Sequence, residues 1–257
     1  MKHLLLLINL DDSRERLERA SGQLQNAALP FMRISAFDGR KINPDDLPVY
    51  DRKKAYKYLG RGMVGGEMGC YFSHLNCAKK FLESDAEIGI VIEDDIQFEA
   101  NFAELITEAV DWMNNNGHAD WEILNFGNQK LKISTPLKQL SPEYGKYSLH
   151  KAHYFPMTTT GIAWSRAGAK AFIDASERIY APVDNYLRHW QTRRDKGFSF
   201  HPPLVATTGS ASEIDTNTTG MRRKNKRALN YYYAKQKRLW IDKFIAAKNK
   251  VLMRFLG

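Results

Sequence analysis

Three consecutive acidic residues, Glu93-Asp94-Asp95, directly follow the apolar segment Ile88–Ile92. The segment is typical of a central strand, and in an open α/β sheet ligands bind beyond the carboxyl ends of the strands. Three adjacent carboxylates repel one another, and a hard cation such as Mn²⁺ or Mg²⁺ relieves that repulsion. The cation can also bridge the phosphates of a nucleotide-sugar and neutralise a leaving diphosphate. The tripeptide therefore indicates a metal site, or else a solvated acidic turn that caps the next helix.

A histidine, His74, lies between Cys70 and Cys77 on a segment with a helical pattern. The spacing resembles half of a zinc site, but zinc needs ligands within about 2.0–2.3 Å, and one straight helix cannot converge three residues over two turns. Structural zinc is therefore not expected. Ser73 and His74 reach a cleft if the helix begins at its mouth. From spacing alone, a packed and hydrogen-bonded histidine is an equal alternative.

Asp184 follows Pro182 at the expected start of another helix. A carboxylate at that position favours the helix dipole, and from position alone this structural role is the stronger interpretation. Serine hydrolase chemistry has no local support, because the chain has no Gly-x-Ser-x-Gly elbow.

The elements that must position these residues alternate in the first half of the chain. Residues 1–126 predict an open parallel sheet with helices on both faces. The expected strands are His3–Leu10, Phe31–Ala36, Ile88–Ile92 and Trp121–Phe126, and the expected helices are Arg14–Gln25, Glu67–Glu83 and Asn101–Met113.

The remaining segments are less regular. Residues 40–60 are polar and irregular, and residues 127–160 are loop-rich with short strands. Further expected elements are a strand at Thr160–Ser165, helices at Arg166–Ser176 and Pro182–Arg193, a mobile loop at Ala206–Gly220 and helical structure from Met221 onward.

The composition is that of an ordinary globular chain, with 257 residues, 43% hydrophobic and 26% charged. The longest apolar run, Leu4–Ile8, is far shorter than the roughly 20 residues of a membrane-spanning helix. It also lacks the length and cleavage site of a signal peptide. Cys70 and Cys77, roughly 10 Å apart on a helix, are too far apart for a disulfide, so nothing indicates an oxidising compartment. A cytoplasmic protein is expected.

Positive charge is concentrated at the C-terminus. From Arg222 to Gly257 there are twelve Lys or Arg residues and one acid, Asp242, so the net charge of +9 leaves −2 for residues 1–221. A basic pI usually indicates nucleic acid or an anionic membrane as partner. Here that indication belongs to the tail and not to the body of the protein.

Several motifs, taken in order along residues 3–215, resemble glycosyltransferase family 25. The group holds bacterial lipooligosaccharide galactosyltransferases and domains related to collagen galactosyltransferase. The most specific match pairs the string Gly66-Glu67-Met68-Gly69-Cys70-Tyr71-Phe72-Ser73-His74 with the downstream Glu93-Asp94-Asp95. The other matching stretches are Ile8-Asn9-Leu10-Asp11 with Arg14 and Arg16, Ala36-Phe37-Asp38-Gly39, Thr160-Gly161-Ile162-Ala163-Trp164-Ser165, Pro182-Val183-Asp184 and Pro202-Pro203-Leu204-Val205.

The resemblance implies a GT-A-type, Rossmann-like fold with a mixed, mostly parallel sheet and flanking helices. It also implies a UDP-sugar donor, most often UDP-galactose, and inversion at the anomeric carbon. It makes Asp95 the preferred metal ligand, together with Asp94, for Mn²⁺ or Mg²⁺. Asp184 is the candidate base, or else belongs to the metal or its surroundings, and Glu93 is the second catalytic candidate. The expected substrate-binding residues are Asn9, Leu10, Arg14, Asp38, Gly39, Glu67, Ser73, His74, Asp94 and Thr160.

We expect a catalytic domain at residues 1–220 and a basic amphipathic tail at residues 221–257. The tail's apolar residues recur at helical spacing among lysines, which predicts docking on an anionic membrane, whereas packing on the body or a second subunit is the alternative. The expected acceptor is a lipid-linked saccharide of the lipooligosaccharide type, and the expected location is the cytoplasmic face of the inner membrane.

Two other functions compete with this interpretation. A metal-dependent phosphohydrolase would use the same acidic cluster without an acceptor sugar. A basic nucleic-acid-binding protein would use the tail, but the nearly neutral body and the lack of a recognisable nucleic-acid fold argue against it, so no nucleic acid is expected.

Overall fold

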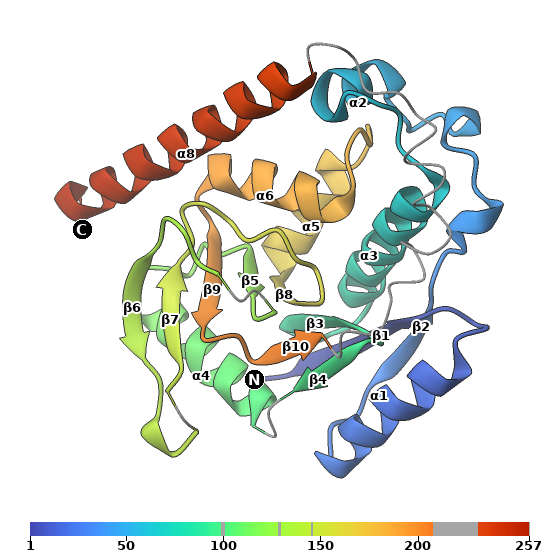
Figure 1. The fold of residues 1–257 in the computed structure, drawn as a ribbon. Helices are drawn as coiled ribbons and strands as arrows, with labels where there is room; N and C mark the ends of the chain where they lie inside the picture. The colour runs from blue at the N-terminus through green and yellow to red at the C-terminus, as the bar shows by residue number, and fades with distance from the viewer. Residues whose placement is uncertain (99–100, 128–129, 145, 208–230, 257) are drawn as a thin grey trace.

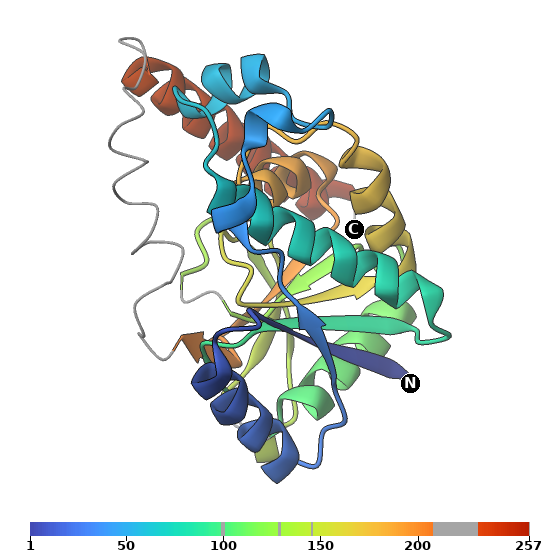
Figure 2. The same ribbon diagram turned by 90° about the vertical axis from the view of Figure 1, so that its right-hand side faces the viewer.

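The computed structural model describes residues 1–98, 101–127, 130–144, 146–207 and 231–256. In these residues one mixed sheet of eight strands has helices on both faces, as Figures 1 and 2 show from two directions. Its strand order is β2-β1-β3-β8-β5-β9-β7-β6, and β4 and β10 form a separate pair. The strands are β1 (His3–Asn9), β2 (Met32–Ser35), β3 (Ile88–Glu93), β4 (Ile96–Phe98), β5 (Ile123–Asn125), β6 (Thr135–Gln139), β7 (Ser148–Lys151), β8 (Gly161–Ser165), β9 (Gly197–His201) and β10 (Val205–Thr207).

The helices are α1 (Arg14–Asn26), α2 (Arg52–Leu59), α3 (Gly65–Glu83), α4 (Phe102–Asn115), α5 (Arg166–Ala175), α6 (Val183–Arg194) and α8 (Tyr231–Leu256). Three short 3₁₀ turns lie at Gly39–Lys41, Pro44–Asp46 and Pro142–Tyr144.

The apolar strands β1 and β3 are buried on both faces because successive side chains point to opposite sides of a strand. Leu6 and Ile8 of β1 face one core, which α2, α3, α5 and α6 cover. Leu5 and Leu7 face the other core, which α1 and α4 cover. The continuous apolar run at the start of the chain is therefore a central strand, as the sequence predicts.

Six strands of the large sheet run in one direction, whereas β7 and β8 run against them. The expected α/β fold with a mixed, mostly parallel sheet is confirmed. One point of topology was not expected, because β8 inserts antiparallel between β3 and β5, which would otherwise be neighbours.

The expectation that residues 40–60 are irregular is wrong in part, because residues 52–59 form α2. Asp51 caps this helix by accepting a hydrogen bond from the Lys54 backbone N–H at 2.8 Å. Its apolar side chains, Ala55, Tyr58 and Leu59, are buried. Of the expected mobile loop, Ala206 and Thr207 belong to β10, and residues 208–220 lie outside the described residues, as do residues 221–230 of the tail.

The remaining tail is the long helix α8, which crosses the outside of α6 and reaches α2 (Figure 1). One side of this helix packs on the body of the protein, whereas its aromatic residues Trp240, Phe244 and Phe255 are exposed. Docking of the apolar stripe on a membrane stays a prediction. Whether residues 1–220 and 221–257 are separate domains stays a prediction.

Candidate active site

The acidic cluster lies where two neighbouring parallel strands end. Ile8 of β1 pairs with Glu93 of β3, so the residues that follow both strands meet at one edge of the sheet. There the Asn9 side-chain amide donates to Asp94 at 2.7 Å, and it also donates to the Ser13 carbonyl at the start of α1. Arg16 of α1 holds the same carboxylate at 2.7 Å. Asp94 is therefore a buried carboxylate that joins β1, α1 and β3.

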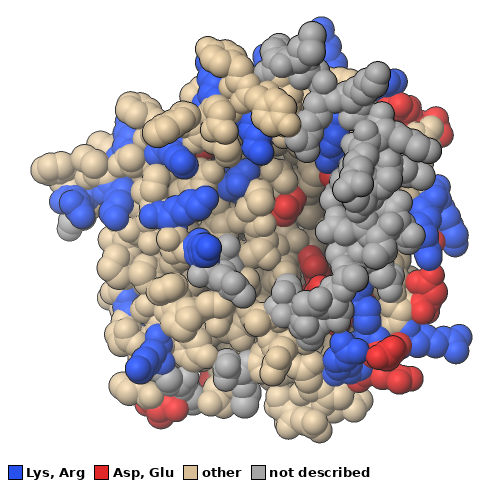
Figure 3. Space-filling model, in the orientation of Figure 1, with Lys and Arg blue, Asp and Glu red and all other residues tan. Residues whose placement is uncertain are grey.

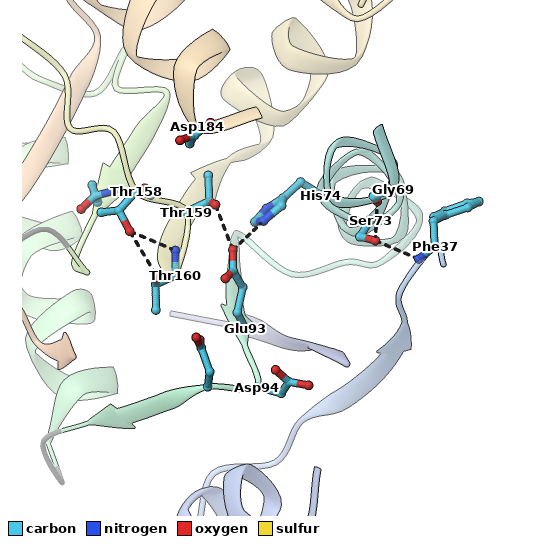
Figure 4. Close-up of polar contacts among 12 residues, drawn as sticks. Phe37, Gly69, Ser73, His74, Glu93, Asp94, Thr158, Thr159, Thr160 and Asp184 are labelled. Carbon is cyan, nitrogen blue, oxygen red and sulfur yellow. Dashed lines mark hydrogen bonds and ion pairs between the residues drawn. The ribbon is translucent and has the colours of Figure 1, made fainter. Parts of the chain in front are cut away.

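Glu93 points the other way, toward α3 and the segment before β8 (Figure 4). Its Oε1 accepts a hydrogen bond from Thr159 at 2.9 Å and lies 3.3 Å from His74 Nε2. Burial raises the pKa of Glu93, but these hydrogen bonds and the imidazole outweigh burial and place it below the usual value. An ionised Glu93 accepts only, so His74 must donate from Nε2. The other imidazole nitrogen, Nδ1, is buried and has no hydrogen-bond partner.

Asp95 is the least satisfied of the three carboxylates. Its Oδ1 is buried without a hydrogen-bond partner, and its Oδ2 lies 3.6 Å from Arg16 Nη2. Burial, followed by the charge of Glu93, raises its pKa to about 6. An unpartnered buried oxygen within an acidic cluster fits a hard cation, which would supply the missing positive charge. The residues present thus suit Mn²⁺ or Mg²⁺ with Asp95 as ligand, while Asn9 and Arg16 already engage Asp94.

Cys70, His74 and Glu93 form a second group whose ligand atoms lie within 4.8 Å of one another. Cys77, which the sequence places on the same helix, is in the apolar core and is not part of this group. Burial raises the pKa of the Cys70 thiol well above its usual value, and the nearby carboxylates of Glu93 and Asp184 add to the shift. The three residues come from two elements, α3 and β3, and not from one helix.

The first turn of α3 lies directly against the backbone of residues 37–42. A Cβ on Gly69 would come within 2.4 Å of the Phe37 carbonyl, and one on Gly39 within 2.3 Å of Gly66 Cα. Ser73 fixes the contact, since its hydroxyl donates to the Gly69 carbonyl and accepts from the Phe37 backbone N–H at 2.9 Å (Figure 4). Glycines are thus required where helix and loop touch. Ser73 holds one wall of the pocket in place.

Asp184 lies in the first turn of α6 and accepts hydrogen bonds from the backbone and side-chain amide of Asn185. Burial raises its pKa, and Glu67 adds to the shift against the lowering effect of Asn185 and Arg188. Figure 4 shows it beyond Thr159 from Glu93, and the two carboxylates share an electrostatic influence on Cys70. A partly desolvated carboxylate near the acidic cluster has the properties of a general base.

The structure brings most of the expected site residues to one pocket. Its lining includes the expected residues Asn9, Leu10, Gly39, Ser73, His74, Glu93, Asp94 and Asp95. Phe37, Cys70 and Arg16 also line it, and none of the three was named as a candidate site residue. Arg16, and not the expected Arg14, lines the pocket. The two residues lie two positions apart on α1 and so point to opposite sides of the helix, and Arg14 is exposed.

Four expected substrate-binding residues, and the candidate base Asp184, do not line this pocket as the described residues form it. Glu67 is buried in a bidentate ion pair with Arg61 and accepts from the Val64 backbone N–H, so it holds the start of α3. Asp38 pairs with Arg40, and Thr160 bonds to Thr158. Arg14 is the fourth.

The spacing Gly60-x-Gly62-x-x-Gly65, which is typical of dinucleotide-binding loops, occurs just before α3. Such a loop connects a strand to a helix, with the pyrophosphate on the helix N-terminus. Here the preceding element is helix α2, and Gly65 lies against the carbonyls of Gly39 and Ile42. The context of a dinucleotide site is therefore not met.

Comparison with known proteins places the chain in a family. The profile of glycosyltransferase family 25 (LPS biosynthesis protein) matches residues 2–187. Procollagen galactosyltransferase 2 of Mus musculus is 26% identical over 83% of this chain and 37% of its own length. Procollagen galactosyltransferase 1-B of Xenopus laevis is 28% identical over 79% of this chain and 36% of its own length.

A glycosyltransferase 25 family member of Aedes aegypti is 29% identical over 71% of this chain and 30% of its own length. The chain thus spans about a third of the length of the curated relatives it matches. The family match runs from β1 into α6 and includes every residue of the pocket described above. The resemblance inferred from the motifs is confirmed, and the chain belongs to glycosyltransferase family 25.

Proposed function

We propose that this chain is an inverting, metal-dependent galactosyltransferase that uses a UDP-sugar donor. The observations that carry the proposal are an unpartnered buried carboxyl oxygen on Asp95, at the end of β3, and a largely desolvated carboxylate on Asp184, in the first turn of α6. Both lie within the region matched by the family profile. Mn²⁺ or Mg²⁺, when bound, would neutralise the negative charge that develops on the UDP leaving group.

The chain's own residues would divide the work. Asp95 offers a ligand oxygen, while Asn9 and Arg16 hold the neighbouring Asp94 and fix the turn after β3. His74 and Thr159 keep Glu93 ionised and oriented. Each group is held before substrate arrives, which is the condition for electrostatic stabilisation of a transition state.

The reaction is a single displacement. An acceptor hydroxyl oxygen forms a bond to the anomeric carbon as the bond from that carbon to the β-phosphate oxygen of UDP breaks. Asp184 takes the proton of the attacking hydroxyl, and the electron pair of the broken bond leaves with UDP. One displacement inverts the configuration at the anomeric carbon.

The family description and the relatives' names point to different acceptors. The family description names LPS biosynthesis, whereas the relatives' names refer to procollagen. We propose a lipid-linked saccharide of the lipooligosaccharide type, met at the cytoplasmic face of the inner membrane. This choice rests on the family description.

A donor and acceptor screen tests the proposal. The full chain is incubated with UDP-galactose, UDP-glucose or UDP-N-acetylglucosamine, with Mn²⁺ or EDTA, and with a lipooligosaccharide or a collagen peptide. We expect transfer from UDP-galactose that needs the metal and the lipooligosaccharide. Transfer to the collagen peptide alone would replace the acceptor. Phosphate release from simple phosphate esters without any acceptor would instead support a phosphohydrolase.

A further inference from the structure

Helix α8 has one side committed to the body of the protein. Asp242 on this side is 1% exposed, pairs with Arg193 at 2.5 Å and lies 3.0 Å from His189 Nδ1. Arg238 stacks its guanidinium 3.7 Å from the centre of the Tyr58 ring and donates to the Tyr58 carbonyl. Ion pairing and stacking thus fix the orientation of α8 on α2 and α6.

The opposite side of the same helix is apolar and exposed. Trp240 is 68% exposed, Phe244 72% and Phe255 82%. Tyr233, Trp240, Phe244 and Val251 recur seven and four residues apart, a spacing that places them on one face of a helix. Tyr232, Ile241 and Leu252 are exposed as well. A contiguous aromatic stripe of this kind marks an interaction surface.

Basic residues border the stripe on both sides. Lys237 and Lys248 lie four residues after Tyr233 and Phe244, and Lys243 and Arg254 lie three residues after Trp240 and Val251. On a helix these offsets flank the stripe in opposite directions. Figure 3 shows blue side chains among tan ones along α8 at the upper left. Asp242 is the single acidic residue of α8, and it is buried against the body.

We propose that this outward face of α8 docks on the surface of a membrane rich in anionic lipids. Aromatic side chains would enter the interface between headgroups and acyl chains while the two rows of cations meet lipid phosphates. A second copy of α8 is a poorer occupant, because the face offers no acid to the facing lysines. None of the helices in the described ranges is long and apolar enough to cross a bilayer. The helix would therefore lie along the surface.

The consequence goes beyond sugar transfer. Docking through α8 would confine the active site to the surface on which a lipid-linked acceptor lies. Binding to vesicles needs neither donor nor acceptor, so it is measured independently of the proposed reaction.

The test uses the full chain and vesicles of phosphatidylcholine with or without phosphatidylglycerol. We expect co-sedimentation with the anionic vesicles alone, weakened by salt. The double variant Trp240→Ser/Phe244→Ser should bind at least about tenfold more weakly, since it removes two inserted rings. The matched control Met32→Ser/Met157→Ser also changes two exposed apolar residues, both outside α8, and should bind like the parent. Thermal unfolding of each variant verifies folding.

A second readout locates the insertion. Anionic vesicles should shift the tryptophan emission of the parent to the blue, and Trp240→Phe should bind while losing most of that shift. Equal binding to neutral vesicles, or parent-like binding by the Trp240→Ser/Phe244→Ser variant, would overturn the proposal. So would a dimer that this variant dissociates, with no binding to anionic vesicles.

Discussion

The acidic cluster after β3 and the basic helix α8 use charge in opposite ways. The carboxylates of Glu93, Asp94 and Asp95 are largely withdrawn from solvent and held by neighbours from three other elements. The cations that border the outer stripe of α8 lie at the surface, and its one acid is buried. Buried charges interact strongly and selectively with a small ligand because solvent screens them little. Exposed charges act over an extended surface and are screened by salt.

The largest loss of transfer activity is expected when Asp184 is changed. Asp184→Asn keeps the shape of the side chain but removes the base, so transfer should fall about 10²- to 10⁴-fold. UDP-galactose binding, measured by calorimetry, should persist. Asp174→Asn, which changes an exposed carboxylate on the neighbouring helix α5, is the matched control and should retain activity. Loss of donor binding in Asp184→Asn would assign this residue to the metal or the donor instead.

A slightly smaller loss is expected when Asp95 is removed. Asp95→Ala should lower metal-dependent transfer about 10²- to 10³-fold, because a positioned electrostatic stabiliser is lost. The fold should remain intact, since Oδ1 of Asp95 has no hydrogen-bond partner to lose. Steady-state rates over a Mn²⁺ titration measure the effect. Turnover within a few-fold of the parent at all Mn²⁺ concentrations would refute the assignment of Asp95 as ligand.

Features that depend on local sequence patterns could be predicted, whereas those that depend on distant partners could not. The apolar runs of β1 and β3 are local signals, so both strands, and the acidic cluster at the end of β3, were predictable from the sequence. The role of Glu67 was not, because its partner Arg61 belongs to an irregular segment and no spacing rule pairs them. Helix α2 was missed for a similar reason, since its apolar side chains pack into the core that it shares with α3, α5 and α6, and Tyr58 stacks on Arg238 of α8, far along the chain.

Two features of the site could be read only in three dimensions. Arg14 and Arg16 are the same residue type on the same helix, and only the orientation of α1 on the sheet decides that Arg16 faces the acidic cluster. The insertion of β8 between β3 and β5 brings Thr159 to Glu93, yet it leaves no local pattern in the sequence. In α8, amphipathic spacing was visible, but not which side would face the body.

The wall of the pocket provides the third prediction. Gly69→Ala would place a methyl group within 2.4 Å of the Phe37 carbonyl, so α3 or residues 37–42 must shift. Overpacking of this kind lowers the free energy of unfolding by about 1–3 kcal/mol. Because the wall moves, donor affinity should also fall. Denaturant unfolding and calorimetry measure the two effects, with Gly22→Ala as control, since a Cβ there meets no atom within 4 Å. Equal stability in both variants would contradict the close-approach argument.

The smallest expected effect concerns Asp242, the one acidic residue of α8. Burial raises the pKa of Asp242, but its bonds with His189 and Arg193 outweigh burial and hold it below its usual value. Ionised Asp242 therefore contributes stability above its unfolded pKa of about 3.8, and that contribution is lost as pH falls through the lower folded value.

Asp242→Asn should lower the free energy of unfolding by about 1 kcal/mol at pH 7. The effect is small because Arg193, the ion-pair partner, is partly solvated. The groups facing Asp242 are His189 and Arg193 of α6, with Tyr58 of α2 and Arg238 of α8 nearby. Thermal unfolding from pH 7 to pH 3 should show the difference between parent and variant closing in acid. A difference that stays constant with pH would mean that packing, and not the ion pair, holds α8 to the body.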